Sequence, residues 1–139
     1  MTSTIEHPFF VDTNVVVYVF TAGGEKADRS EQILESGAVV SVQVLNEAAL
    51  TLRRKFKASW SAIREMSASL RTSCRVVDLS EATHVRALDI AERYQLNIYD
   101  ANIAAAALLA GCRTLLSEDM HDGLVIDGLT IKNPYAGLA

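Results

Sequence analysis

Phe9-Phe10-Val11-Asp12-Thr13-Asn14-Val15-Val16, residues 9–16, is an apolar run with a polar interruption at its centre. The aromatic and β-branched residues before the interruption favour a buried strand. Asp, Thr and Asn favour turns and helix N-caps, so we expect the strand to end at Asp12 and a short, buried helix to follow it. Gly23 and Gly24 are expected to end that helix.

Apolar strands and amphipathic helices are expected to alternate along the rest of the chain. Segments with apolar residues three and four positions apart predict helices at residues 25–36, 44–52, 59–72, 81–94 and 100–111. Short apolar runs predict strands at residues 38–42, 75–79, 114–116 and 129–132. This alternation favours an α/β fold, in which helices cover both faces of a parallel sheet.

Length and composition predict one globular domain spanning residues 1–139. Half of the residues are hydrophobic and 22% are charged, which excludes an intrinsically disordered chain. Cys74 and Cys112 do not form a metal-binding pattern, and we expect free thiols in a reducing compartment. The longest apolar stretch, residues 101–111, is too short to span a bilayer, and no signal peptide is visible. We therefore expect a cytoplasmic protein with no membrane contact.

The charge is distributed unevenly, although the net charge is only -4. Residues 53–75 contain seven basic residues and one acidic residue, a local balance of +6, and the remainder carries -10. A basic segment beside an acidic remainder is suited to a polyanion such as RNA, and Arg53, Arg54 and Lys55 are the candidate phosphate contacts. A solvated helix face would produce the same pattern.

Four carboxylates occur at predicted junctions between strands and helices: Asp12, Glu47, Asp100 and Asp119. In a doubly wound sheet such junctions lie at one edge, where functional sites gather. Carboxylates that converge in a partly buried place repel one another unless a cation neutralises them. Mg²⁺ or Mn²⁺ prefers oxygen ligands, and such an ion can activate water and hold a phosphodiester.

Each of these carboxylates also has a structural explanation. Asp12 could be a plain helix cap, and Asp100 could complement the positive end of its helix. Asp119 could lie in a surface loop. Glu47 is the hardest to explain in this way, because its apolar neighbours bring it close to a buried helix face, where an unpaired carboxylate is costly.

Three further polar residues are candidates for supporting roles at the same site. Asn14 could hydrogen-bond a carboxylate or fix the turn after the first strand. Ser117 could steady Asp119 or a metal-bound water. Asp122 could be a fifth acidic group near the ion. Ordinary loop chemistry explains each of them equally well.

The acidic residues lie in segments that resemble the motifs of the PIN-domain family, in the same order. These segments are Val11-Asp12-Thr13-Asn14, Gln43-Val44-Leu45-Asn46-Glu47, Tyr99-Asp100-Ala101-Asn102-Ile103 and Leu116-Ser117-Glu118-Asp119-Met120. The ending at residues 127–134 is similar to the last strand of the toxin-like members, known as VapC toxins. The resemblance covers essentially the whole chain, and residues 53–80 carry the least of it.

The resemblance implies a three-layer α/β/α sandwich around a mostly parallel sheet. It also implies an endoribonuclease that depends on Mg²⁺ or Mn²⁺, with a cognate antitoxin as partner and a tendency to form homodimers. Position by position, Asp12, Glu47, Asp100 and Asp119 match the acidic quartet of the family. Asn14 and Ser117 match its usual polar positions, and Asp122 falls where relatives vary.

Two other classes of protein compete with a nuclease. A non-catalytic PIN-like module that binds RNA or a protein would keep the fold, although a complete quartet argues against it. A phosphoryl-transfer domain of the receiver or haloacid-dehalogenase kind would also have an aspartate after the first strand. The dehalogenase pattern needs a second aspartate where this chain has Asn14, and neither phosphoryl-transfer class explains Glu47.

Overall fold

The computed structural model describes residues 5–21 and 23–138. Its strands are short, between two and four residues: β1 Phe9–Val11, β2 Val39–Ser41, β3 Arg75–Val77, β4 Thr114–Leu116, β5 Val125–Ile126 and β6 Leu129–Lys132. Its helices are α1 Thr13–Val19, α2 Glu25–Glu35, α3 Val42–Lys55, α4 Trp60–Ser73, α5 Glu81–Tyr94 and α6 Ile98–Leu109. None of the described helices is long and apolar enough to cross a membrane.

The strands form one sheet in the order β3-β2-β1-β4-β6-β5. All neighbouring pairs are parallel except β5 and β6, which form an antiparallel hairpin. Strands β2 and β3 are added on one side of β1, and β4, β6 and β5 on the other. The strand order therefore changes direction between β1 and β4, as in other doubly wound folds. The expected mostly parallel sheet is confirmed.

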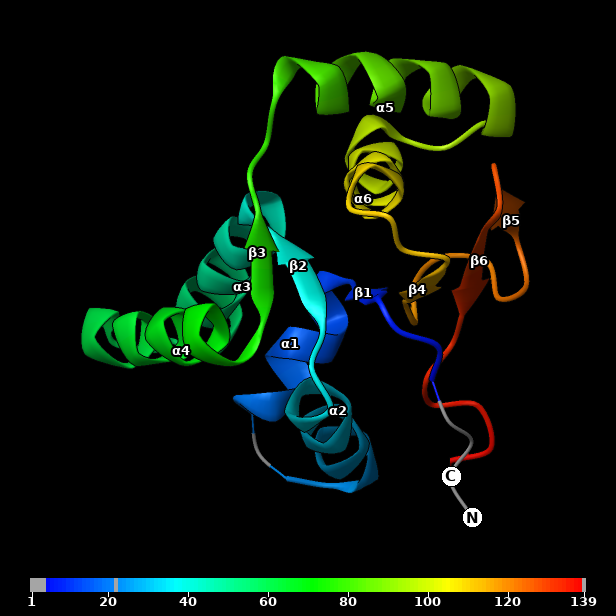
Figure 1. Cartoon of the computed structure of the whole chain (residues 1–139). Helices are drawn as coiled ribbons and strands as arrows, with labels where there is room; N and C mark the ends of the chain where they lie inside the picture. The colour runs from blue at the N-terminus through cyan, green and yellow to red at the C-terminus, as the bar shows by residue number, and fades with distance from the viewer. Residues whose placement is uncertain (1–4, 22, 139) are drawn as a thin grey trace.

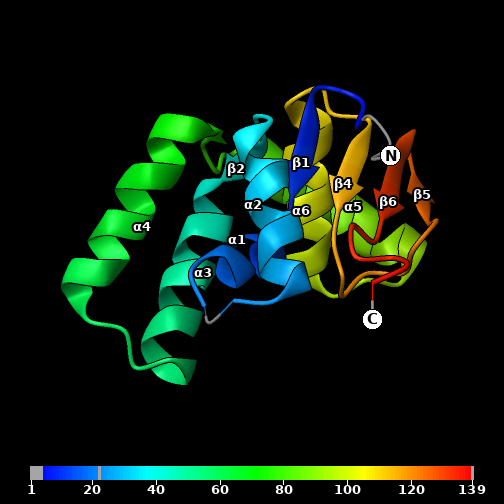
Figure 2. The same cartoon turned by 90° about the horizontal axis from the view of Figure 1, so that it is seen from below.

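The helices form a layer on each side of the sheet (Figures 1 and 2). The pair α5 and α6 covers one face, α1 and α2 cover the other, and α3 and α4 flank the end formed by β2 and β3. This arrangement confirms the expected α/β/α sandwich. It also explains why all three residues of β1 are buried, since a strand covered on both faces needs apolar side chains in both directions.

The alanine-rich helix α6 packs closely against the centre of the sheet. Five of its residues between Ala101 and Ala107 are alanines with little or no exposure, and Ile103 is buried beside them. Small side chains let the helix axis approach the strands, and this fixes the position of the first turn of α6, which carries Asp100.

Several expected boundaries were wrong. The helix expected at residues 44–52 runs from Val42 to Lys55, and the strand expected at residues 75–79 ends at Val77. Helix α1 ends at Val19, before Gly23, because the backbone N–H groups of Phe20 and Thr21 close the last turn onto the carbonyls of Val17 and Tyr18. Gly24 instead precedes α2, with a φ of 111° that favours glycine. The expected helix at 100–111 starts at Ile98, because the side chain of Asn97 caps it.

The antiparallel strand β5 was not predicted from the sequence. It has only two residues, and Val125 and Ile126 pair with Thr130 and Leu129 across a tight turn. Such a short strand depends on its partner rather than on a pattern of its own.

Candidate active site

Asp12 lies where β1 ends and α1 begins. Its backbone N–H donates to the carbonyl of Leu116 at 2.9 Å, which joins it to the end of the neighbouring strand β4. Its carboxylate accepts from the N–H of Thr13 at 2.7 Å and from the hydroxyl of Ser117 at 2.8 Å. Asp12 is therefore the helix cap that its residue type suggests, but it is also held across two strands.

Burial raises the pKa of the Asp12 carboxyl to about 6. Hydrogen bonds from Ser117 and Thr13 favour the ionised form, but they do not offset the loss of water. The negative charges of Asp100 and Glu47 raise this pKa further, which shows that the three groups share one electrostatic environment.

Glu47 comes from α3, on the other side of Thr13. Its carboxylate accepts from the Thr13 hydroxyl at 3.2 Å and from the amide of Gln43, one turn earlier, at 2.6 Å. The same Gln43 amide donates to the carbonyl of Tyr99 at 3.2 Å, so α3 is tied to the first turn of α6. The half-buried position expected for Glu47 is confirmed.

Asp100 lies in that first turn of α6, half-buried. Its backbone N–H donates to the capping oxygen of Asn97, and its carboxylate accepts from the Asn97 amide, both at 2.9 Å. Burial raises the pKa of Asp100, the Asn97 hydrogen bond lowers it, and the charge of Asp119 raises it again. Asp100 and Asp119 are thus electrostatic neighbours as well.

Asp119 lies in the loop after β4 and is linked to α1 by Asn14. The Asn14 amide donates to the Asp119 carboxylate at 3.0 Å, and the Asn14 oxygen accepts from the backbone N–H of Glu118 at 3.4 Å. The expected hydrogen bond from Asn14 to a carboxylate is therefore present. Ser117 differs from expectation, because its hydroxyl contacts Asp12 and the N–H of Met120 rather than Asp119.

These four carboxylates, which we call the acidic edge, lie at the carboxyl ends of the central strands: Asp12, Glu47, Asp100 and Asp119. The side-chain and backbone groups that donate hydrogen bonds to them are all neutral. Within residues 5–21 and 23–138, no lysine, arginine or histidine forms an ion pair with any of the four. The negative charge at this edge is therefore left without a compensating cation from the described chain.

A divalent cation fits the donor chemistry of the acidic edge, which offers carboxylate oxygens only. No three acidic, histidine or cysteine side chains of the described residues converge on a single point as a closed metal cage would. Mg²⁺ does not need such a cage, because it keeps several waters and is commonly held by one or two carboxylates. The donor set thus suits an open Mg²⁺ or Mn²⁺ site rather than a structural one.

Glu118 is a functional candidate that the sequence alone did not single out. Its carboxylate accepts from the Tyr18 hydroxyl at 2.5 Å and forms an ion pair with Lys26. The Lys26 ammonium also lies over the rings of Tyr18 and Tyr135. Burial raises the pKa of Glu118, but the hydrogen bonds from Lys26 and Tyr18 outweigh it and hold that pKa below its ordinary value. This network anchors the residue directly before Asp119.

The other candidates lie further out. The carboxylate of Asp122 accepts from the backbone N–H of Asn133 at 2.8 Å, which fixes the C-terminal segment. Arg53 donates to the carbonyl of Ala58 at 3.0 Å and therefore stabilises the turn between α3 and α4. Arg54 is exposed, and Lys55 is the only one of the three expected phosphate contacts that lines the pocket described next.

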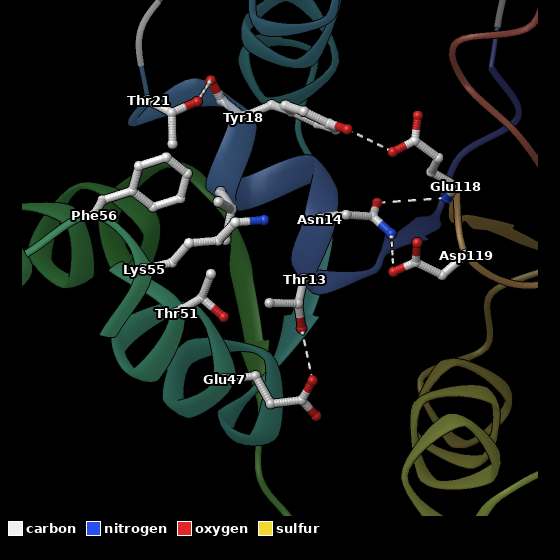
Figure 3. A pocket seen from close by; sticks show the side chains of 11 residues that line it. Thr13, Asn14, Tyr18, Thr21, Glu47, Thr51, Lys55, Phe56, Glu118 and Asp119 are labelled. Carbon is white, nitrogen blue, oxygen red and sulfur yellow. Dashed lines mark hydrogen bonds between the residues drawn. The ribbon is translucent and has the colours of Figure 1, made fainter. Parts of the chain in front are cut away.

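A pocket of about 360 Å³ opens between α1, α3 and the loop after β4 (Figure 3). We call it the α1–α3 pocket. One end is lined by acidic and amide side chains, and the other by Tyr18, Thr21, Thr51, Lys55 and Phe56. Glu47 and Asp119 of the acidic edge belong to its wall, so whatever enters the pocket is brought beside these carboxylates.

The sequence of residues 9–121 matches the family model described as PIN domain. No curated protein matches the sequence. The match includes all four residues of the acidic edge and most of the chain.

Solved structures share the fold at low identity. A toxin–antitoxin complex from Klebsiella pneumoniae is 20% identical, with a TM-score of 0.71 over 92% of this chain and 98% of that chain. VapC20 of Mycobacterium tuberculosis, a sarcin-ricin loop cleaving toxin, is 22% identical, with a TM-score of 0.67 over 80% of this chain and 91% of that chain. DNA-bound VapBC from Salmonella typhimurium is 18% identical, with a TM-score of 0.64 over 91% of this chain and 98% of that chain. The chain therefore belongs to the PIN-domain family and has the fold of its VapC toxin structures.

Proposed function

We propose that this chain is an endoribonuclease that depends on Mg²⁺ or Mn²⁺ and acts as the toxin of a toxin–antitoxin pair. The observation that carries the proposal is the acidic edge, whose four carboxylates have only neutral hydrogen-bond donors and no ion-pair partner among the described residues. An enzyme that holds a catalytic cation needs such uncompensated charge.

In this mechanism, Asp12, Glu47, Asp100 and Asp119 would hold the metal. A bound Mg²⁺ or Mn²⁺ supplies an activated water and electrostatic stabilisation of the phosphodiester. The chain itself orients the carboxylates: Ser117 and Thr13 fix Asp12, and Asn14 fixes Asp119. Asp12 must be ionised to bind a cation, so its raised pKa makes the site weaker in mildly acidic solution.

The basic residues at the end of α3 are proposed to hold the RNA backbone. Lys55 lines the pocket beside the acidic edge, and Arg54 is exposed next to it. Arg53 would act mainly by holding the turn in place, because its guanidinium contacts Ala58 and lies 5.0 Å from the centre of the Trp60 ring. The RNA phosphates would then contact the basic residues at the end of α3, and the carboxylates of the acidic edge would lie on the opposite side of the RNA backbone.

A cognate antitoxin and a second copy of this chain are the proposed protein partners. The complexes from Klebsiella pneumoniae and Salmonella typhimurium contain such toxin–antitoxin pairs on the same fold. Copurification of the chain with the product of a neighbouring gene, and its mass in solution, would test these two partners directly.

Cleavage of a structured RNA by the purified protein tests the enzymatic proposal. We expect cutting with Mg²⁺ or Mn²⁺, none with EDTA, and none with Asp100→Asn under any condition. Cleavage that persists in Asp100→Asn with EDTA would contradict both the metal and the site. Because a toxin can require one particular RNA, total cellular RNA is the appropriate substrate for the first assay.

A non-catalytic PIN-like binding module is the second candidate. One observation favours it: no three acidic, histidine or cysteine side chains of the described residues are grouped closely enough to hold a metal ion together. A protein of this kind would bind RNA or the antitoxin and would not cut any RNA with either metal. Mn²⁺ binding measured by calorimetry separates the two candidates, because the binding module does not need the cation.

A further inference from the structure

We infer that the α1–α3 pocket is a nucleobase subsite, which takes one unpaired base of the RNA beside the scissile phosphate. This inference rests on the proposed nuclease function and deepens it. The pocket volume of about 360 Å³ lies within the usual range for small-molecule sites, roughly 300–1,000 Å³. The pocket is therefore large enough for a single flipped nucleotide and too small for a duplex.

Phe56 supplies the flat apolar surface that a base needs. Phe56 is 45% exposed, although large aromatic side chains are normally buried in a core. It stands at the end of α3, where Lys57 takes a left-handed φ of 56° and the N–H of Ala58 donates to the carbonyl of Leu52 at 3.0 Å. The backbone turn thus holds the ring at the pocket mouth (Figure 3).

Tyr18 forms the opposite wall and is held rigidly. Its hydroxyl donates to Glu118 at 2.5 Å, and its ring packs edge-on against Tyr135 with 5.2 Å between the ring centres. Because the Tyr18 side chain is already fixed, little conformational entropy is lost when a ligand binds against it. Proteins that bind single-stranded RNA commonly stack unpaired bases on such aromatic side chains.

Two polar groups near the Phe56 end are free to contact a nucleotide. The hydroxyl of Thr51 has no hydrogen-bond partner within residues 5–21 and 23–138, so it can donate to or accept from a base edge. The ammonium of Lys55 has no carboxylate partner in the same residues, and Figure 3 shows it pointing into the pocket. It lies 6.0 Å from the centre of the Phe56 ring, at the limit of a cation–π contact, and can move to an adjacent phosphate.

The two ends of the pocket therefore have different chemistry. Asn14, Glu47 and Asp119 lie at the acidic end, where the scissile phosphate and its cation would bind, and Phe56 and Lys55 lie at the other. A base at the Phe56 end belongs to a nucleotide next to the cleaved bond. The pocket thus selects RNA in which that nucleotide is unpaired, and it discriminates against continuous duplex.

The test separates base stacking from phosphate binding. Binding of two fluorescently labelled RNA strands is measured by anisotropy in EDTA, so that no cleavage occurs: a decamer of adenylate and a decamer of abasic ribose-phosphates. Wild type is compared with Phe56→Leu, which keeps an apolar side chain without a ring, and with Phe56→Trp, which keeps a ring. Leu88→Ala is the control, because Leu88 is an exposed apolar residue on α5 that does not line the pocket.

We expect Phe56→Leu to weaken binding of the adenylate strand about tenfold and to leave binding of the abasic strand unchanged, as loss of one stacked base requires. Phe56→Trp should restore most of the affinity, and Leu88→Ala should not change it. Equal affinities of wild type and Phe56→Leu for the adenylate strand would overturn the subsite. Equal losses for both strands, or an equal loss in Leu88→Ala, would also overturn it. If wild type binds neither strand, the subsite is overturned, whereas the proposed nuclease function is judged separately by cleavage of total cellular RNA with Mg²⁺ or Mn²⁺. If wild type binds both strands and every variant binds each strand as wild type does, the subsite is overturned and the proposed nuclease function is not.

Discussion

Two regions of this molecule shift the pKa of a carboxyl group in opposite directions. In the turn between β5 and β6, the carboxylate of Asp127 accepts from Arg93 at 2.6 Å and from Arg86 at 3.0 Å. These bonds lower the pKa of Asp127 to about 2. At the acidic edge, Asp12 is nearly inaccessible, has neutral donors only, and has a pKa raised to about 6.

The difference indicates what each region is for. Asp127 links the β5–β6 hairpin to α5 through ion pairs with Arg86 and Arg93. Asp12 does the reverse, because it places negative charge where water is scarce and forms no ion pair within the described residues. An arrangement that lowers the stability of the isolated fold is expected where a ligand later supplies the missing charge.

The largest effect is expected from replacing carboxylates of the acidic edge. Asp100→Asn and Asp119→Asn should each reduce metal-dependent RNA cleavage by at least about a hundredfold, because each removes a charge that the cation needs. Asp127→Asn is the control and should cleave RNA as wild type does. Equal activity in all three variants would remove the distinction between the two regions.

A second effect concerns the stability of the metal-free protein. Above pH 6, ionised Asp12 lowers the free energy of unfolding, since its pKa is about 6 in the folded chain and about 3.8 in the unfolded one. Asp12→Asn should therefore raise that free energy by on the order of 2–3 kcal/mol at pH 8. The gain should shrink as the pH falls through 6 and vanish below about 4. Denaturant unfolding in EDTA at several pH values measures it, and a gain that does not depend on pH would contradict this origin.

Glu118 tests whether the network beside Asp119 positions the acidic edge. Tyr18→Phe removes one of its hydrogen bonds, and we expect roughly a tenfold loss of kcat with little change in KM, as for residues that orient a metal ligand. Glu118→Gln keeps the shape but loses the ion pair with Lys26 and should behave similarly. A change in KM alone would assign the network to substrate binding instead.

The smallest effect is expected at Asp127. Asp127→Asn should lower Tm slightly at pH 7, because the ionised carboxylate stabilises the fold at every pH above its unfolded pKa. The loss should disappear as the pH falls toward 2. At high pH, Asp127→Asn should thus lower the stability, whereas Asp12→Asn should raise it. Thermal melts of both variants across the same pH range test this contrast, and a change of Tm in the same direction in both variants would contradict it.

Much of this molecule could be predicted from the sequence because local chemistry fixes it. The turn at Asp12-Thr13-Asn14 placed the first strand and helix correctly, and Ser41, Ser59 and Ser80 cap α3, α4 and α5. Three of the four carboxylates could be found because each follows a strand or lies in the first turn of a helix, and Glu47 could be found because it lies in the second turn of the helix after β2. The sequence therefore identified the acidic edge as a candidate site.

Contacts between distant segments could not be predicted in the same way. Tyr18, Lys26 and Glu118 meet although about a hundred positions separate the first from the last, and nothing local to any of them signals it. Arg53 appeared to be a free phosphate contact, but the turn after α3 brings the carbonyl of Ala58 within its reach. Both cases depend on tertiary geometry that residue types and spacing do not encode.

We propose that a divalent ion, and no basic side chain of the described residues, balances the negative charge of the acidic edge. Thermal unfolding of wild type and Asp100→Asn, each with increasing Mn²⁺, tests this claim without any RNA. We predict that Mn²⁺ raises the Tm of wild type by several degrees at saturation, since a ligand of the folded state stabilises it, and that Asp100→Asn shows little or no shift. An unchanged Tm for wild type, or the same rise in the variant, would contradict the account.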